Sequence, residues 1–529
     1  MNVFRFAPAL FFALCCVGEI VAILRATHGV FTYSVDDPYI HLAVAENILR
    51  GTYGINLNHS AAPCSSILWP FLLVPFTLTP WSVFGPLVLN LAAGMFTVEV
   101  LRRFFDSLWE PKSVLEQFCV TAAVCVAFVS TNVVGLVFTG MEHSLQVLLV
   151  VLILYGARLE QRDRRLRPWV VVSITCLPLI RYESAAFAVA FLIYFFWRGH
   201  RSLTLAAGAV SATSLLGFSL FLKAQGLWFL PSSVIAKARP AGDGALLMLV
   251  NKVVSVVQSV HGTPRATLFL ALLFAFAGFA AASRQATSRG IALSLAAATA
   301  GHLFVGNYGQ FGRYEVYLWT AQLLGIAWML SEAVKLAPQR VPAVALTAAL
   351  GVFALSLNFA SKIVKTPGAA RNIYEQQFQM RRFVVDFYRK PVAINDLGLV
   401  SYQNDNYVLD LWGLGSIEVL ALRAGSPSSD WIGPLTARHG VELAMIYEDY
   451  FDKIPETWTR LGTLKLAGAL VSAGDDEVSF WATAPASAAE IGPLLERFAA
   501  TLPPGVTFSA GARRPAKSVG RMLQAAAGD

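Results

Sequence analysis

Two adjacent acidic residues, Asp36 and Asp37, follow the first apolar segment of the chain and stand directly before Pro38. A carboxylate in such a place can take the proton of a hydroxyl group, which is the task of a general base. Apolar residues then repeat at helical spacing until Gly51, so we predict a short amphipathic helix lying along a bilayer surface, with Asp37 as its N-cap. Because an N-cap carboxylate is engaged by helix amides, we expect Asp36 to be the catalytic base. Asp37 is expected to hold the helix start, or to act only as a cap beside a solvated Asp36.

Three cationic residues, Arg181, Lys237 and Arg313, stand where apolar segments end, on the side expected to carry the acidic pair. Cations at a membrane edge can bind a phosphate group by charge-assisted hydrogen bonds and stabilise it as it departs. Two other interpretations remain open at this point. Lys237 and Arg313 can serve as anchors at the membrane interface, and Arg181 can simply pair with Glu183.

Glu142 begins another apolar segment. A carboxylate there can join Asp37 as a ligand of a divalent metal ion, because Mg²⁺ and Mn²⁺ prefer oxygen ligands. It can equally cap the helix that follows. Both roles therefore remain open for this residue.

The composition identifies a membrane protein. The chain has 529 residues, of which 56% are hydrophobic and 14% charged, and its mean hydropathy is +0.57. These values are too apolar for a soluble protein and allow many membrane spans. The net charge of +8 comes from Lys and Arg in short loops between apolar segments, which is the positive-inside pattern and does not indicate nucleic-acid binding.

Several common enzyme classes lack support in the sequence. There is no P-loop, no GxSxG, no HExxH and no CxxC pair, so nucleotide hydrolysis, serine or zinc hydrolysis and a cysteine metal site are not indicated. The C-terminal region has no GxGxxG, which argues against a nucleotide-sugar donor bound by a Rossmann fold.

We predict an all-α membrane bundle of about eleven transmembrane helices in residues 1–360, with an external loop at 31–65. Residues 4–24 are expected to form an uncleaved first span that begins in the cytoplasm. The dense basic loop at 158–169 is expected to be cytoplasmic, and the loop at 223–264 external. Two apolar stretches are ambiguous: 67–101 forms one crossing with a lead-in or two short crossings, and 169–197 forms two short helices or one deep break.

Charge and turn residues return after Ser361, which predicts a C-terminal soluble α/β domain over residues 361–529. We expect a helix at 371–389, strands at 392–395, 407–411 and 443–447, and a mobile tail after Pro503.

The motifs together resemble the GT-C membrane glycosyltransferases, in particular bacterial arabinofuranosyltransferases. The strongest likeness lies in the first external loop, and further stretches match in part; they are DDPYIH (36–41), AENI (45–48), GTYGIN (51–56), TGMEH (139–143), RYE (181–183), LPSSVIAK (230–237), GRY (312–314) and the segments 394–402 and 408–414. In that family the first external loop carries the catalytic acid. The resemblance implies a GT-C fold, a polyprenyl-phosphate sugar donor and a divalent metal, Mg²⁺ or Mn²⁺.

The expected function is therefore that of an inverting glycosyltransferase in the inner membrane. It would move a sugar from a polyprenyl phosphate to a glycan, lipid or protein acceptor of the cell envelope, on the periplasmic side. Neither the sugars nor a monophosphate or diphosphate carrier can be read from the sequence. Two alternatives are a transporter or flippase of lipid-linked sugars, which typically has paired repeats that this sequence lacks, and a non-catalytic scaffold for envelope assembly.

The topology leads to a labelling prediction. In a background without native cysteines, Ser65→Cys in the acidic loop and Ser428→Cys in the C-terminal domain should both react with an impermeant thiol reagent added from outside, because the basic loops at 158–167 and 335–340 belong in the cytoplasm. A cysteine at Arg164 is the matched control and should react only after the membrane is permeabilised. Labelling of only one of the two outer positions would refute the topology.

Overall fold

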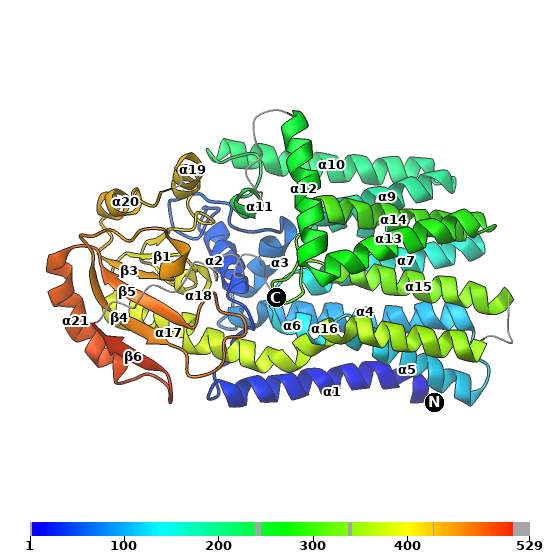
Figure 1. Cartoon of the computed structure of the whole chain (residues 1–529), viewed down its shortest axis with the longest axis horizontal. Helices are drawn as coiled ribbons and strands as arrows, with labels where there is room; N and C mark the ends of the chain where they lie inside the picture. The colour runs from blue at the N-terminus through cyan, green and yellow to red at the C-terminus, as the bar shows by residue number, and fades with distance from the viewer. Residues whose placement is uncertain (1–2, 238–244, 337–340, 427, 512–529) are drawn as a thin grey trace. The chain divides into compact units, whose positions relative to one another are not determined.

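The computed structural model describes residues 3–237, 245–336, 341–426 and 428–511 (Figure 1). The chain divides into two compact units, and each contains segments that are distant in the sequence. The helical unit comprises Met1–Gly18, Leu87–Gly217 and Ala241–Val364, and the sheet unit comprises Glu19–Pro86, Phe218–Pro240 and Lys365–Asp529. The acidic loop thus belongs to the same unit as the C-terminal domain, which differs from the linear division expected from the composition.

Within the described residues, five helices are long and apolar enough to cross a membrane. They are α1 (Val3–Ala26), α4 (Gly85–Trp109), α7 (His143–Asp163), α10 (Arg201–Ala224) and α13 (Pro264–Ala282). The expected count of about eleven spans is not confirmed. The remaining long or apolar helices are α3 (Leu68–Thr77), α5 (Val114–Ser130), α8 (Pro168–Ile180), α9 (Ala185–Trp197), α14 (Ala286–Val305), α15 (Val316–Leu336) and α16 (Val341–Glu375).

Both ambiguous stretches are broken in the structure. The stretch 67–101 forms the short helix α3, a 3-10 turn at Ser82–Phe84 and most of the long helix α4, an arrangement that fits either alternative. The stretch 169–197 forms α8 and α9, joined by a single 3-10 turn at Tyr182–Ser184. The described residues of the segment 223–264 form two helices, α11 (Ser232–Lys237) and α12 (Ala245–Gly262), neither of which was predicted.

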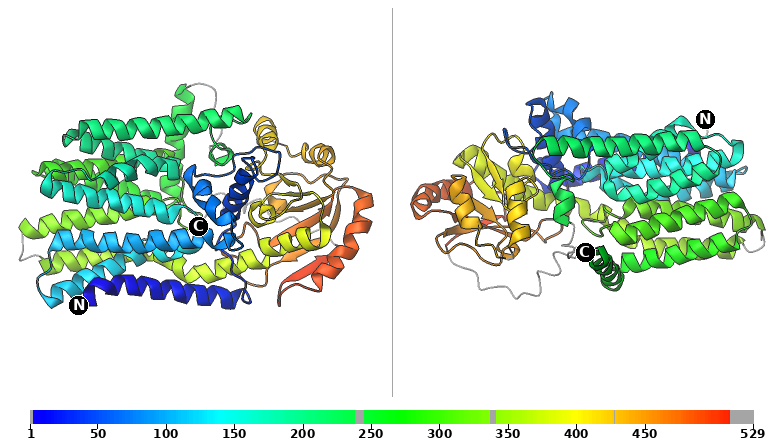
Figure 2. Two further views of the ribbon diagram at one scale, coloured as in Figure 1. Left: turned by 180° about the vertical axis from the view of Figure 1, so that it is seen from behind. Right: turned by 90° about the horizontal axis from the view of Figure 1, so that it is seen from above.

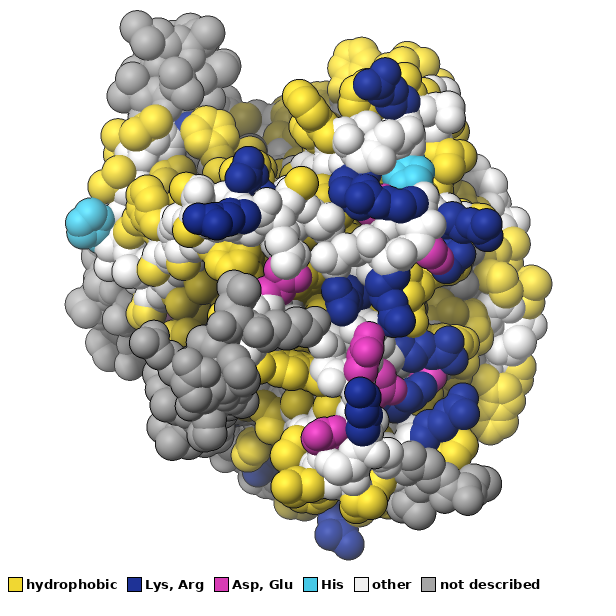
Figure 3. Space-filling view, turned by 90° about the vertical axis from the view of Figure 1, so that its right-hand side faces the viewer, with side chains coloured by type: hydrophobic (Ala, Val, Ile, Leu, Met, Phe, Trp, Pro, Cys, Tyr) yellow, Lys and Arg dark blue, Asp and Glu magenta, His cyan; other side chains and the backbone are white. Residues whose placement is uncertain are grey.

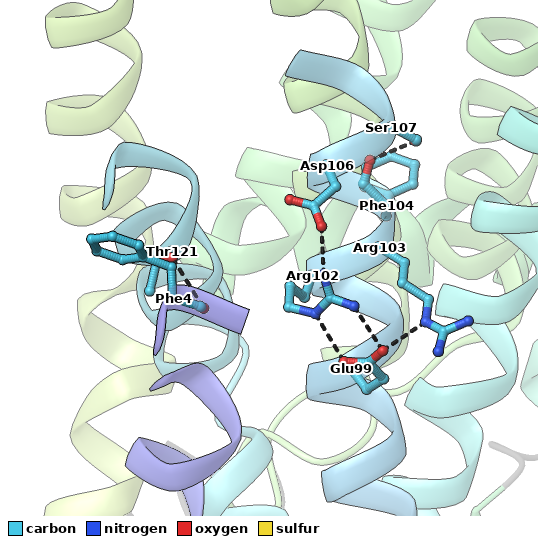
Figure 4. Close-up of polar contacts among 8 residues, drawn as sticks. All are labelled: Phe4, Glu99, Arg102, Arg103, Phe104, Asp106, Ser107 and Thr121. Atoms are coloured by element: carbon cyan, nitrogen blue, oxygen red, sulfur yellow. Dashed lines mark hydrogen bonds and ion pairs between the residues drawn. The ribbon is translucent and has the colours of Figure 1, made fainter. Parts of the chain in front are cut away.

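One end face of the helical unit is basic. Figure 3 shows Lys and Arg side chains gathered on this face, with a few acids between them. Figure 4 shows how one group of these charges is arranged on α4. Arg102 lies between Glu99, at 2.8 Å, and Asp106, at 2.5 Å, while Arg103 also contacts Glu99. Both Arg102 and Arg103 lie within α4, which ends at Trp109.

The C-terminal α/β fold is confirmed by a six-stranded sheet of order β2-β1-β3-β5-β4-β6. The strands are β1 (Val392–Ile394), β2 (Val408–Asp410), β3 (Leu443–Ile446), β4 (Thr459–Lys465), β5 (Glu477–Ala482) and β6 (Thr507–Ala510). The first three match the predicted strands and pair in parallel, whereas the last three, which were not predicted, pair antiparallel. They contain Gly462 and polar residues, so their apolar alternation is weak.

Helices cover both faces of this sheet (Figure 2). Successive side chains of a strand point to opposite faces, and Trp481 and Phe480 on β5 follow this rule. Trp481 belongs to a core with residues of α19 (Ile417–Gly425) and α20 (Ile432–Arg438). Phe480 instead meets Phe383, whose ring also lies 5.2 Å from Phe498 of α21 (Pro485–Ala499).

The predicted helix at 371–389 is divided among three elements. Residue 371 lies in α16, which continues without a break through the expected domain boundary at residue 360 and ends at Glu375. It is followed by α17 (Gln377–Arg382) and a π-helix at Phe383–Tyr388. Propensity alone does not reveal such a break, because it depends on which carbonyl each backbone N–H finds in the folded chain.

Candidate functional site

Asp36 is held by the C-terminal part of the sheet unit. Its carboxylate accepts hydrogen bonds from the backbone N–H of Gly398, at 2.6 Å, and of Leu399, at 2.9 Å. Only 6% of its surface is exposed. A Cβ atom on Gly398 would lie 2.1 Å from the carbonyl oxygen of Asp36, so glycine is required for this approach. Asp36 therefore lies in a preformed cradle of backbone donors.

The predicted cap of the first-loop helix is wrong. The helix α2 (Asp37–Leu49) begins at Asp37, so Asp36 occupies the N-cap position. The side chain of Asp36 accepts no hydrogen bond from the backbone of this helix. The reason is that both oxygens of Asp36 face Gly398 and Leu399. Most of α2 is buried, including Ile40 and Val44, so it packs inside the sheet unit rather than along a bilayer surface.

A second acid, the half-buried Asp396, lies beside Asp36. Its carboxylate accepts a hydrogen bond from Gln377 Nε2, at 2.7 Å, and lies 3.1 Å from the hydroxyl of Tyr447. The two carboxyl groups are close enough for the charge of Asp396 to act on Asp36. Asp396 belongs to the segment 394–402 of the family resemblance, but no role was predicted for it, because nothing in the sequence places it near Asp36.

Burial raises the pKa of Asp36 well above its ordinary value, and the charge of Asp396 adds to this effect. The N–H donors of Leu399 and Gly398 act in the opposite direction. Burial likewise raises the pKa of Asp396. A carboxyl group with a raised pKa is a stronger base when ionised, and the neighbouring Asp37 is only half-buried. The cradle therefore holds Asp36 as a strong base, with Asp396 as a second acid beside it.

Two of the predicted phosphate ligands, Arg181 and Arg313, meet in the helical unit at one aromatic ring. Each guanidinium lies 5.4 Å from the ring centroid of Tyr314. Arg181 also forms ion pairs with Glu142, at 2.9 Å, and with Glu183, at 2.6 Å. The alternative pairing of Arg181 with Glu183 is thus present. In an apolar surrounding such pairing is expected, because an uncompensated buried charge is costly.

The predicted metal ligand Glu142 is a partner of Arg181 in this structure and makes no cap with its side chain. Among the described residues, no group of three or more His, Cys, Asp or Glu side chains is arranged to hold a metal ion. Lys237 is the last residue of α11 in the sheet unit.

Comparison with known proteins gives one family match, in which residues 371–481 fit a domain of unknown function, DUF8728. No curated protein matches the chain. Among solved structures, ArnT from Cupriavidus metallidurans bound to undecaprenyl phosphate is 12% identical, covering 90% of this chain and 98% of that one, with a TM-score of 0.45. The arabinofuranosyltransferase AftD from Mycobacteria is 14% identical, covering 90% of this chain but 41% of that one, with a TM-score of 0.41. Values this low describe a distant likeness of fold and assign no activity.

The cradle makes a prediction for Gly398. We expect Gly398→Ala to lower the free energy of unfolding by about 1–3 kcal/mol, the usual cost of overpacking, because the new methyl group would displace Asp36. Thermal unfolding of the purified protein measures this change.

Gly492→Ala in α21 is the matched control, since a Cβ atom there meets nothing within 4 Å and alanine favours a helix. Equal stability of the two variants would show that Asp36 does not depend on the close approach of Gly398.

Proposed function

We propose that this protein is an inverting glycosyltransferase that moves a sugar from a polyprenyl-phosphate carrier to an acceptor of the cell envelope, at the outer face of the inner membrane. The observation that carries the proposal is the cradle, in which a buried acid from the first loop is oriented by Gly398 and Leu399 and has a raised pKa. The resemblance of that loop to the catalytic loop of GT-C enzymes supports the same reading.

In the proposed reaction Asp36 acts as the general base. Each of its oxygens accepts one backbone N–H and keeps a second lone pair for the hydroxyl of the acceptor. As the proton passes to Asp36, the acceptor oxygen bonds to the anomeric carbon and the bond from that carbon to the phosphate oxygen breaks. A single displacement from the face opposite the phosphate inverts the anomeric configuration.

The departing phosphate carries away the electron pair of the broken bond and must be stabilised by positive charge. We assign this role to Arg181, Lys237 and Arg313. Arg181 already has two acidic partners, Glu142 and Glu183, so a phosphate would take the place of a carboxylate beside it. A requirement for Mg²⁺ or Mn²⁺ rests on the family resemblance alone.

Replacing the acids separately tests the assignment. Asp36→Asn should reduce sugar transfer by about 10²–10⁴, the usual contribution of a positioned base, while leaving donor binding intact. Asp37→Asn should have a smaller effect. Transfer of radiolabelled sugar from a synthetic polyprenyl phosphate in proteoliposomes measures both variants, and thermal unfolding confirms that each is folded.

A variant Asp36→Asn with nearly normal turnover would refute Asp36 as the base. An inactive Asp37→Asn beside it would move the role by one residue.

The acid pair predicts a specific pH dependence. Transfer requires ionised Asp36, so kcat/KM should fall as the pH drops through its raised pKa. In Asp396→Asn one negative neighbour is lost, which lowers the pKa of Asp36 and should shift this acidic limb to lower pH. The pH profile of kcat/KM measures the shift.

Asp430→Asn, at an exposed acid of the same unit, is the control and should leave the limb in place. If the limb of Asp396→Asn also stayed in place, the titrating group would not be Asp36 in contact with Asp396.

A further inference from the structure

A pocket of about 610 Å³ opens at the other end of α2, within the sheet unit. It is lined by α2, by the turn that follows it, by the segment after α18 (Gly398–Ser401) and by the end of α20. Its lining includes Glu46, Arg50, His59, Gln403, Asn404, Asp405, Asn406, Tyr407, Arg438 and His439. We call it the α2 pocket.

The α2 pocket continues the contact that holds Asp36. Asp36, Ala43 and Arg50 are spaced by seven residues, about two helical turns, so they lie on the same side of α2 and its two caps. The segment beginning at Gly398 runs beside that face: its first N–H groups bind Asp36, and its residue Asp405 meets Arg50 at 3.3 Å. Between these points, Glu46 accepts a hydrogen bond from the backbone N–H of Gln403.

The distance between the base and the pocket follows from the helix. Glu46 comes ten residues after Asp36, and a rise of 1.5 Å per residue separates them by about 15 Å. This exceeds the size of one sugar ring. A ligand that reached both places would be a chain of several rings.

The lining favours a neutral, hydroxyl-rich ligand. Its cations are already balanced, since Arg50 pairs with Asp405 and Arg438 pairs with Glu418. A phosphate would find no surplus of positive charge there. The amides of Gln403, Asn404 and Asn406 can donate and accept hydrogen bonds, as the hydroxyl groups of a sugar do.

The same pocket also contains aromatic rings, onto which the apolar face of a sugar ring can pack. The ring of Tyr407 lies 4.9 Å from that of His59 and is stacked on that of His439 at 5.4 Å. The ring of His59 is exposed at the rim. Amides and carboxylates around a small aromatic platform are suited to a saccharide, whereas a lipid chain would need a mainly apolar lining.

We propose that the α2 pocket binds the acceptor glycan, several sugar residues away from the hydroxyl group that reacts at Asp36. This inference rests on the proposed function, because it assumes that the sugar is transferred to an oligosaccharide. It names the acceptor as a glycan chain rather than a lipid or a protein side chain.

Binding of glycans by the full-length protein in nanodiscs tests the proposal without requiring transfer. The probe is an array of immobilised short pyranose and furanose oligosaccharides together with the corresponding monosaccharides. We expect wild-type protein to bind at least one oligosaccharide more tightly than its monosaccharide. His59→Ala and Glu46→Gln should each weaken this binding about tenfold, the effect of losing one good contact.

Lys453→Ala, at an exposed ion pair of the same unit outside the pocket, is the matched control and should bind as wild type does. Absence of oligosaccharide binding, or equal binding by all variants, would overturn the glycan site. Binding that depends on His59 and Glu46 in a protein that transfers no sugar would support the glycan site and overturn the proposed transferase.

Discussion

The carboxylate of Asp36 accepts hydrogen bonds from two backbone N–H groups. These bonds join parts of the chain that are 362 residues apart. Burying a carboxyl group is costly unless its oxygens accept hydrogen bonds. The buried Asp36 therefore depends on the N–H groups of Gly398 and Leu399. Those two residues begin α18, which follows strand β1 after the three residues 395–397. The environment of the proposed base is thus built by the C-terminal domain, and the first loop alone cannot supply it.

The contact with the C-terminal domain extends along the whole first loop. Beyond α2, Asn56 donates to the carbonyl of Val408 at 2.8 Å and accepts from its N–H at the same distance. These two bonds satisfy backbone groups of strand β2. The loop and the sheet therefore form one folded unit, in which a change at either segment reaches the other. This arrangement gives the acid pair a fixed geometry, which a general base needs in order to act.

The helical unit follows a different electrostatic rule. Three of its arginines lie beside acids: Arg181 with Glu142, Arg198 with Glu160 at 2.9 Å, and Arg265 with Glu315 at 2.6 Å. An apolar surrounding makes each unpaired charge costly, so the pairs hold the helices in register as well as positioning the arginines. The sheet unit instead places two acids together, and burial raises the pKa of both.

The sequence by itself determined the features that depend on composition and local pattern. Apolar length predicted the apolar helices at residues 4–24 and 203–222, and turn residues with short apolar runs predicted three of the strands. The charged break at Arg181 predicted the interruption between α8 and α9. It also singled out the loop that carries Asp36.

Only the tertiary structure decided what surrounds these residues. The partnership of Asp36 with Gly398 and Asp396 could not be predicted, because a carboxylate next to a proline has the pattern of a helix cap and the competing donors lie far away in the chain. For the same reason the pairing of Arg181 with Glu142 was not foreseen. Local sequence determines which groups are available, whereas burial and long-range hydrogen bonds decide which of them meet.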